Sequence, residues 1–505
     1  MSVEKSIIRS SVIVTVFTVS AAALGFLSQV VIAYLFGASA ELDAYLTAGA
    51  LPLTFSGLVL GGIGYTLIPI LSNTHEKEVP RSVTSCFLAT LGVASSMAVA
   101  GAFVSQYTLR WTAPGLSAQK LELCAHLQVF FWLAAGFTVV ASFFVGVSHF
   151  YKKFPVPAAS TLITPVCTIL SGLLWGRKLG VYSIAGGFLL GSMIQCVLVF
   201  LAINAGRQLW SRGLSSVARQ YLGTSVPVII SLLPYTLIPA IDAFWCARLP
   251  DGSLSYLGYA TRISIGLAGV TVQGISAVIF PFLAQHSAVG EMDALRSRVV
   301  GALKFVLFLM IPMATLLFVV RAPVIALLFQ RGRFNEQSTL GLSNVLPWYL
   351  VGMVSMAGMN IVSRGFYAVR DLRTPVLMAV CSLFCYFTLS GLLSRKYSYI
   401  GIGVTYALYW SLQLAAATHL LGRRTGSLWQ TPETKILLKV VAFCFAVGVV
   451  LHFLSVYLPS DIQGLYRIVS LTLTGSVLLA ILGRFALGSG ELQPFSEALS
   501  RGKRS

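Results

Sequence analysis

Long apolar stretches separated by short polar breaks dominate the pattern of hydrophobic and polar positions along the chain. Most of these stretches reach the roughly 20 residues that a helix needs to cross the hydrocarbon core of a bilayer. No break between them is long enough to fold into a soluble catalytic domain. The pattern predicts about fourteen transmembrane helices, near residues 11–36, 43–72, 82–108, 121–150, 156–176, 179–206, 220–247, 254–284, 299–320, 340–363, 374–394, 399–421, 436–458 and 468–489.

The predicted helices also repeat. A Phe-Tyr pair that precedes a basic turn, a proline and a new span occurs at residues 150–151 and again, 216 residues later, at 366–367. Gln195 and Gln413, inside the sixth and twelfth predicted spans, are 218 residues apart. Because a shift of six spans preserves orientation in the membrane, the repeat is parallel, with its axis along the membrane normal.

This repeat predicts an all-α integral membrane protein with two pseudo-symmetric six-helix lobes around a central cavity. Residues 1–210 form the N-terminal lobe and residues 211–425 the C-terminal lobe. Residues 426–505 add two further transmembrane helices and a basic cytoplasmic tail. Two such lobes can rock about the cavity between them, an architecture that favours an alternating-access transporter over a channel or a scaffold.

Composition excludes several other classes of protein. The chain is 56% hydrophobic and only 10% charged, against roughly 25% charged residues in soluble domains. Its mean hydropathy is +0.84. A water-soluble enzyme and a nucleic-acid-binding module are therefore excluded. The chain has no phosphate-binding loop motif for ATP, and its eight cysteines lie in apolar runs without zinc-like spacing, so no metal or cofactor is predicted.

The basic residues predict an orientation. The net charge is +19, and a membrane protein places Lys and Arg mainly in cytoplasmic loops, which face anionic lipid. With both termini in the cytoplasm, 22 of the 35 basic residues fall in inside segments and 11 in outside segments. We therefore expect an even number of spans and two cytoplasmic termini.

Few charges lie inside the predicted spans, and each costs about 2.5–3.5 kcal/mol at the bilayer centre. Asp43 begins the second span, Asp242 lies late in the seventh, and Arg262 lies near the start of the eighth. If these residues face the central cavity, they would form an outer gate or bind an anionic headgroup. Alternatively, the two aspartates are wetted helix-end residues and the arginine extends to the membrane interface.

Several short motifs occur in a recognisable order from about residue 5 to residue 425. Leu35-Phe36-Gly37-Ala38 precedes Asp43-Ala44, and Gly252-Ser253-Leu254-Ser255 precedes Tyr259-Ala260-Thr261-Arg262. Then come Arg331-Gly332-Arg333-Phe334 and Phe366-Tyr367-Ala368 with Asp371 and Thr374-Pro375. With these motifs the chain resembles the MurJ/MviN family of lipid II flippases, within the multidrug/oligosaccharidyl-lipid/polysaccharide exporter superfamily.

The resemblance implies a fourteen-helix flippase of the bacterial cytoplasmic (inner) membrane. Its substrate would be lipid II, an undecaprenyl-pyrophosphate-linked peptidoglycan precursor, carried from the inner to the outer leaflet for cell-wall synthesis. Its partners would be membrane lipids and the cell-wall synthesis machinery. The resemblance assigns Asp43 and Arg262 to substrate binding or gating, and Asp242 to a coupling cation, Na⁺ or H⁺.

Other charges of the family are missing. The arginines usual in the first two spans fall here on Ala22, Ser28 and Ser56, and an acidic position falls on Gly61. The first lobe thus lacks much of the expected pyrophosphate-binding charge. This departure keeps open a flippase for another polyprenyl-linked oligosaccharide, of O-antigen or capsule type. A cation-coupled multidrug exporter of the same superfamily is a further alternative, whereas a membrane enzyme would need clustered loop carboxylates that the chain lacks.

Overall fold

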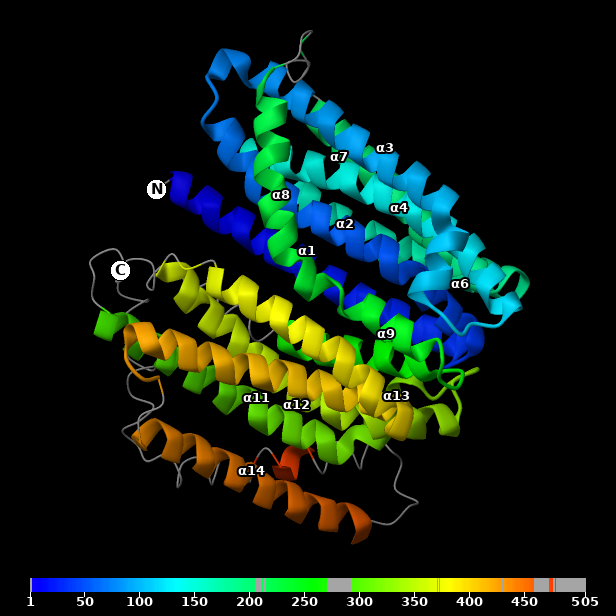
Figure 1. Cartoon of the computed structure of the whole chain (residues 1–505), viewed down its shortest axis with the longest axis vertical. Helices are drawn as coiled ribbons and strands as arrows, with labels where there is room; N and C mark the ends of the chain where they lie inside the picture. The colour runs from blue at the N-terminus through cyan, green and yellow to red at the C-terminus, as the bar shows by residue number, and fades with distance from the viewer. Residues whose placement is uncertain are drawn as a thin grey trace. The chain divides into compact units, whose positions relative to one another are not determined.

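The structure is a computed structural model that describes residues 2–204, 211, 215–269, 292–369, 371, 373–428, 431–457, 472–475 and 477. The described part of the chain contains only helices and the turns that join them (Figure 1). Residues 253–269 are helical as well. The remaining elements are α1 (Ser2–Phe36), α2 (Ala40–Ser72), η1 (Glu76–Glu78), α3 (Val79–Thr112), α4 (Ala118–Phe150), α5 (Pro155–Ser160), α6 (Ile163–Leu179), α7 (Val181–Asn204), α8 (Val217–Thr236), α9 (Ile238–Cys246), α11 (Met292–Phe329), α12 (Glu336–Ala368), α13 (Arg373–Thr425) and α14 (Thr431–Tyr457).

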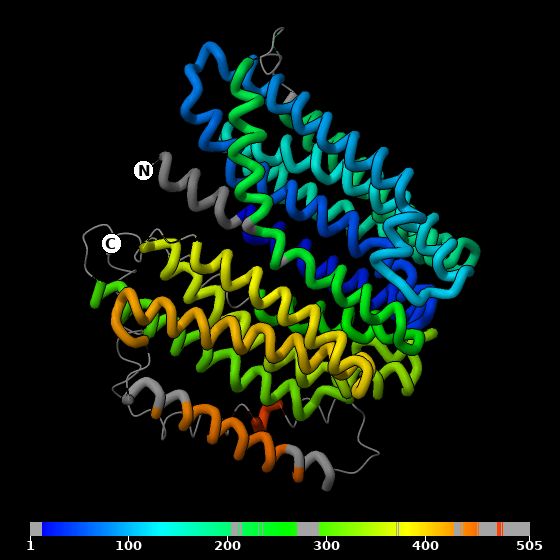
Figure 2. Tube along the Cα trace, in the orientation of Figure 1, coloured from blue at the N-terminus to red at the C-terminus, as the bar shows by residue number. Residues whose placement is uncertain are grey.

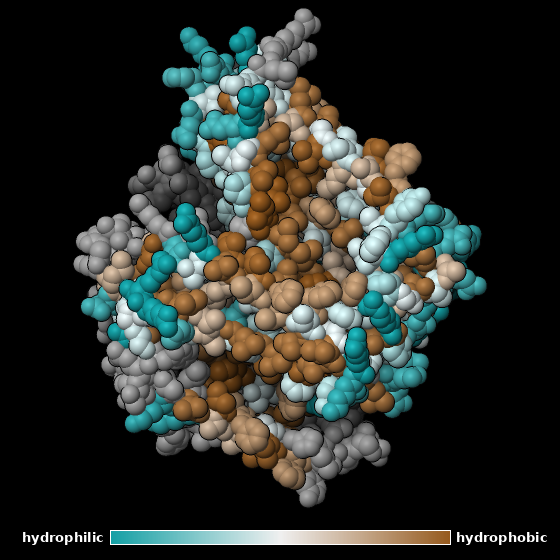
Figure 3. Space-filling model, viewed as in Figure 1, coloured by the Kyte–Doolittle hydropathy of each residue, from teal (hydrophilic) through white to brown (hydrophobic). Residues whose placement is uncertain are grey.

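Many of these helices are built to cross a membrane. Among the described residues, nine helices are long and apolar enough to do so, or ten if the bent pair Val217–Ile230 and Leu232–Cys246, which covers α8 and α9, counts as one span. On α3, the rings of Phe103 and Trp111 are each 82% exposed, as expected of side chains that face lipid. Apolar side chains cover the flanks of the helices, and hydrophilic ones gather toward helix ends (Figure 3).

The predicted spans correspond to these helices, with three differences in detail. The span expected at 156–176 starts with the separate short helix α5, and the span at 220–247 is divided into α8 and α9 at a bend (Figure 2). The spans expected at 374–394 and 399–421 are joined in α13, which breaks at Ser398. Residues 270–284, nearly all of the span at 468–489 and the basic tail lie outside the described residues.

The break in α13 supports the internal repeat. Ser398 has φ 53° and ψ −142°, and Gly180, between α6 and α7, has φ 55° and ψ −142°. These two residues are 218 positions apart, the same spacing as Gln195 and Gln413. A positive φ costs a serine more than a glycine, so the second copy of this helical hairpin keeps the turn although it has lost the glycine.

Two compact units make up the chain. Unit 1 comprises Met1–Arg262, Arg331–Ser338 and Phe387–Ile402, and unit 2 the rest. Leu67, Phe143 and Val199 belong to the unit 1 core, where α2, α3, α4 and α7 pack together. In unit 2, Val320 of α11 packs with Val447 of α14. The lobe boundary expected near residue 210 stays a prediction.

Polar contacts attach α8 to the core helices of unit 1. The Thr54 hydroxyl of α2 donates to the Thr236 carbonyl at the end of α8, at 3.0 Å. About three turns further along α2, the Thr66 and Ser225 hydroxyls are 2.9 Å apart. Such contacts between membrane helices contribute about 0.6 kcal/mol each, and the first also satisfies a carbonyl that the proline-containing bend leaves without an intrahelical donor.

Candidate functional site

Asp43 sits in the first turn of α2, directly after a tight turn from α1. Gly37 makes this turn at φ 62°. The Ser39 side chain caps α2 by accepting a hydrogen bond from the Leu42 amide. These local features place the Asp43 carboxylate at the start of the helix, where the helix dipole favours a negative charge.

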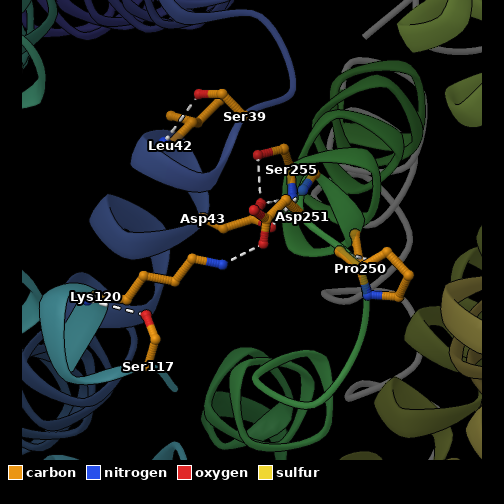
Figure 4. Close-up of polar contacts among 10 residues, drawn as sticks. Ser39, Leu42, Asp43, Ser117, Lys120, Pro250, Asp251 and Ser255 are labelled. Carbon is orange, nitrogen blue, oxygen red and sulfur yellow. Dashed lines mark hydrogen bonds and ion pairs between the residues drawn. The ribbon is translucent and has the colours of Figure 1, made fainter. Parts of the chain in front are cut away.

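The Asp43 carboxylate caps a second helix that is more than 200 residues away in sequence. One oxygen accepts hydrogen bonds from the Ser255 amide at 2.7 Å and the Ser255 hydroxyl at 2.6 Å. The other accepts from the Gly252 amide at 2.7 Å. Asp43 and Ser255 face each other in Figure 4. Because the amides at a helix start have no partner inside their own helix, Asp43 supplies the N-cap that residues 253–269 need.

A third segment joins this contact. The Tyr259 hydroxyl donates to the Gly37 carbonyl at 3.0 Å, and its ring packs edge-on against buried Phe334, with centroids 5.5 Å apart. The Arg333 amide donates to the Tyr34 carbonyl at 2.9 Å. We refer to residues 34–43, 250–259 and 331–334 together as the Asp43 junction.

The Arg331-Gly332-Arg333-Phe334 motif is explained by this junction. Gly332 has φ 62°, and a Cβ there would lie 2.2 Å from the Tyr34 carbonyl oxygen. Only glycine allows the two backbones to approach so closely. Phe334, two residues later, is 1% exposed, so the motif combines a close backbone approach with an apolar anchor.

Ion pairs surround the junction. Lys120, in the first turn of α4, pairs with Asp251 (Figure 4), and Arg333 pairs with Glu41 at 3.3 Å. All four side chains are partly or largely exposed, so each pair contributes little energy. Sequence reasoning did not identify these pairs, because their members lie on separate elements without a shared periodicity.

Unit 1 also contains residues from the second half of the sequence. Residues 331–338 and 387–402 belong to the same compact unit as the first-half helices. Within that unit, the Trp245 indole donates to the Phe387 carbonyl at 3.0 Å, and Tyr256 packs on Tyr399 with centroids 5.0 Å apart. Segments from both sequence halves are thus joined at this end of unit 1.

Arg262 lies apart from Asp43. It lies seven residues beyond Ser255 on the same helix, about 10 Å along the axis. Its side chain is exposed and close enough to Tyr45 for an electrostatic interaction. No acidic side chain pairs with it among the described residues. Arg262 is therefore available to a ligand, whereas the oxygens of Asp43 are occupied by backbone and hydroxyl donors.

Asp242 lies in α9 and is 6% exposed. It and Asp43 both interact electrostatically with the Cys246 thiol, so the two carboxylates approach the same buried residue from α9 and α2. In the described part of the chain, no group of three or more His, Cys, Asp or Glu residues could hold a metal ion. The assignment of Asp242 to a coupling cation stays a prediction.

The positions without the expected charge offer no substitute donors. The Ser28 hydroxyl donates to the Gly25 carbonyl at 3.0 Å, and that of Ser56 donates to the Leu53 carbonyl at 3.0 Å; both serines are buried. A Cβ at Gly61 would lie 2.2 Å from Leu232 of α8. Helix packing thus fills the acidic position.

Ala22, the fourth of these positions, is exposed on α1 and has no polar side-chain atom. None of the four positions therefore presents a free hydrogen-bond donor to a headgroup.

In unit 2, Asp371 organises the turn between α12 and α13. Its carboxylate accepts a hydrogen bond from the Thr374 amide at 3.1 Å and pairs with Arg424 at 2.9 Å. Burial alone would raise the pKa of the Asp371 carboxyl, but hydrogen bonds from Thr374 and the charge of Arg424 hold this pKa below its usual value. The Asp…Thr-Pro motif thus ties the start of α13 to its own end.

Comparisons with known proteins agree with this architecture. A family model described as lipid II flippase MurJ matches residues 32–471. The probable lipid II flippase MurJ of Vibrio cholerae is 25% identical over 439 residues, which cover 82% of this chain and 83% of that protein.

Solved structures show the same fold. The structure of lipid II flippase MurJ in an inward closed conformation matches with a TM-score of 0.82 at 20% identity, over 94% of this chain and all of that one. An inward-facing multidrug resistance MATE family transporter of the MOP superfamily matches with a TM-score of 0.71 at 12% identity, over 81% of this chain and 95% of that one. Since the family model spans most of the sequence, the chain belongs to the lipid II flippase MurJ family.

Proposed function

We propose that this protein is a transporter, not an enzyme, that moves lipid II from the inner to the outer leaflet of the bacterial cytoplasmic membrane by alternating access. Besides the family membership, the Asp43 junction is the observation that carries the proposal. It closes one end of unit 1 with contacts between turns and helix ends. Such contacts can open without unfolding a helix, as a gate requires.

In the proposed orientation both termini lie in the cytoplasm, which places the Asp43 junction at the outer face. A closed outer face corresponds to the state that accepts a substrate from the inner leaflet. The excess of basic residues in the inside segments supports this orientation.

Arg262 is the proposed contact for the substrate's pyrophosphate. It is exposed and has no acidic partner among the described residues. A guanidinium recognises phosphate oxygens through paired hydrogen bonds. Ser28 and Ser56 use their hydroxyls within their own helices, so Arg262 takes a larger share of headgroup binding here than an arginine in a more highly charged cavity would.

Asp242 is the proposed site of cation coupling. A buried charged carboxylate inside a membrane span is costly, and such residues are usually functional. Asp242 lies about one turn after the break between α8 and α9. Binding of Na⁺ or H⁺ at Asp242 would neutralise this charge. Unchanged dependence of transport on both cations in Asp242→Asn would remove this assignment.

Arg262→Ala tests the substrate contact. We expect this variant to reach the membrane in normal amounts but to fail to support growth of a strain depleted of its lipid II flippase, with labelled lipid II retained in the inner leaflet. Arg262→Lys keeps the charge but not the paired geometry, and should restore part of the function. Arg110→Ala removes an exposed arginine of α3 and is the matched control. Normal growth with Arg262→Ala would exclude the contact.

A second candidate function is the movement of another polyprenyl-linked glycan. The observation that favours it is the absence of free donors at Ala22, Ser28, Ser56 and Gly61. Vesicles containing the purified protein, given either lipid II or a pyrophosphate-linked glycolipid without peptide, distinguish the two candidates. Faster translocation of the peptide-free lipid would favour this second function.

A further inference from the structure

Unit 2 contains a cavity that the proposed transport cycle does not use. Its volume is about 690 Å³, and it is partly open. It lies between α11, α12, the last part of α13 and α14, with Leu307, Val354, Leu414 and Val441 among its walls. All of the lining residues belong to unit 2.

The body of the cavity is effectively apolar although hydroxyl groups line it. The Ser355 and Ser411 hydroxyls bond to each other at 2.9 Å. The Thr418 hydroxyl donates to the Ala415 carbonyl at 3.0 Å. Because these groups are already paired, they offer little to a polar ligand, and water there would lack the two to four partners that it needs.

The rim of the cavity is cationic. Ser411, Ala415, His419 and Arg423 follow one another at intervals of four along α13, so they share one face of the helix. His419 and Arg423 are both exposed, and no acidic side chain pairs with either in the described part of the chain. The neighbouring Arg424 differs, because it pairs with Asp371.

The dimensions match one leaflet of a bilayer. From Ser411 to Arg423, α13 rises about 18 Å, and half of the hydrocarbon core is roughly 15 Å thick. A partly open, largely apolar cavity of this length beside membrane-spanning helices suits an acyl chain better than water. A charged rim at the end of such a cavity selects a lipid with an anionic headgroup.

We propose that this cavity is a binding site for an anionic phospholipid of the surrounding bilayer. One acyl chain occupies the apolar body, and the phosphate contacts Arg423, with His419 beside it. The lipid would fill the gap beside α14, which packs on α11 through small clusters such as Cys444 with Ile311. Bound lipid therefore stabilises the attachment of α14.

Thermal unfolding of the purified full-length protein in detergent tests the site. We expect phosphatidylglycerol to raise the unfolding temperature by several degrees more than phosphatidylcholine with the same acyl chains. Arg423→Gln should abolish this difference. Arg424→Gln is the matched control: it should lower the unfolding temperature, because Asp371 loses its partner, but should keep the difference between the lipids.

Ala415→Trp tests the apolar body, because it fills the cavity and leaves the cationic rim intact. Native mass spectrometry should show one retained phosphatidylglycerol on the unaltered protein and on Arg424→Gln, and none on Arg423→Gln or Ala415→Trp. Equal effects of the two phospholipids on the unaltered protein would overturn the proposal. So would a full effect of glycerol phosphate without acyl chains, or one-for-one displacement of the phospholipid by lipid II. The proposal does not depend on transport activity.

Discussion

Asp43 and Asp371 both cap helix N-termini, but they join very different parts of the chain. Asp43 accepts three hydrogen bonds from Gly252 and Ser255, more than 200 residues away. No basic side chain pairs with it among the described residues. Asp371 caps the first helix of α13 at Thr374 and pairs with Arg424 at the end of the second helix of the same hairpin.

The two carboxylates therefore differ in which helices their contacts hold together. The Asp371 contacts lie within one helical hairpin, because α13 breaks at Ser398, so they persist as long as two helices that follow each other directly in sequence stay packed. The Asp43 contacts depend on two helices remaining side by side, and they break when those helices separate. The same chemistry therefore braces a hairpin in unit 2 and, in the proposed transport cycle, would act as a reversible latch in unit 1.

The largest effect is expected from Asp43→Ala. Each hydrogen bond to a charged group contributes about 1.5–3 kcal/mol, so loss of the acceptor should shift the balance toward an open junction by at least about tenfold. The reporter is Ser253→Cys in a background without native cysteines, because Ser253 is 1% exposed. Its thiol should react faster with an impermeant reagent once Asp43 is replaced.

Glu41→Gln is the control for this experiment, because Glu41 lies in the same helical turn but is exposed. It should leave the labelling rate nearly unchanged, whereas transport should fall only with Asp43→Ala. If the reporter cysteine is labelled equally fast with and without the Asp43→Ala substitution, the junction is not a latch.

A smaller effect is expected from Asp371→Asn, in which asparagine still caps the helix but the charge that pairs with Arg424 is lost; exchanging hydrogen bonds to a charged group for bonds to a neutral one should cost about 1–2 kcal/mol at neutral pH. The pKa of Asp371 is lowered in the folded protein. Its stabilising contribution is therefore complete above the unfolded value of about 3.9, and it is lost as the pH falls through the folded value.

Unfolding temperatures of the two proteins measured from about pH 7 to pH 3 check this prediction. The gap between the unaltered protein and Asp371→Asn should be constant above about pH 5 and should narrow below about pH 4. A gap that widens on acidification would contradict the assigned direction of the pKa shift.

The smallest effect is expected at the exposed pair of Lys120 and Asp251. Lys120→Met should change the free energy of unfolding by about 0.2–1 kcal/mol, and high salt should remove most of the difference. A double-mutant cycle with Asp251→Asn measures the coupling directly. A coupling as large as the effect of Asp43→Ala would show that the ion pair, and not the cap, holds the junction closed.

Much of the fold was predictable, because a membrane span is encoded locally by its length and hydropathy. The repeat was visible as well, although its two copies have diverged in chemistry. Gln195 accepts a hydrogen bond from Thr164 at 3.2 Å. Gln413 is 1% exposed, and neither amide atom finds a hydrogen-bond partner among the described residues. The matching positions of the two glutamines in the repeat therefore did not predict the same hydrogen bonds for both.

The candidate site was predictable only in part. The position of Asp43 at the start of a span singled it out, but nothing in the sequence pairs it with Gly252 and Ser255. Arg423 and Arg424 are adjacent and look equivalent in sequence. Only the position of Asp371 distinguishes the paired arginine from the one at the rim of the unit 2 cavity.

The sequence by itself determined that this chain crosses the membrane many times, that its helices repeat, and which few charges lie within them. These properties follow from transfer free energies and periodicity, which each segment carries alone. The tertiary structure decided which groups those charges meet. Partner choice depends on contacts between segments hundreds of residues apart, and a linear pattern contains no information about such distances.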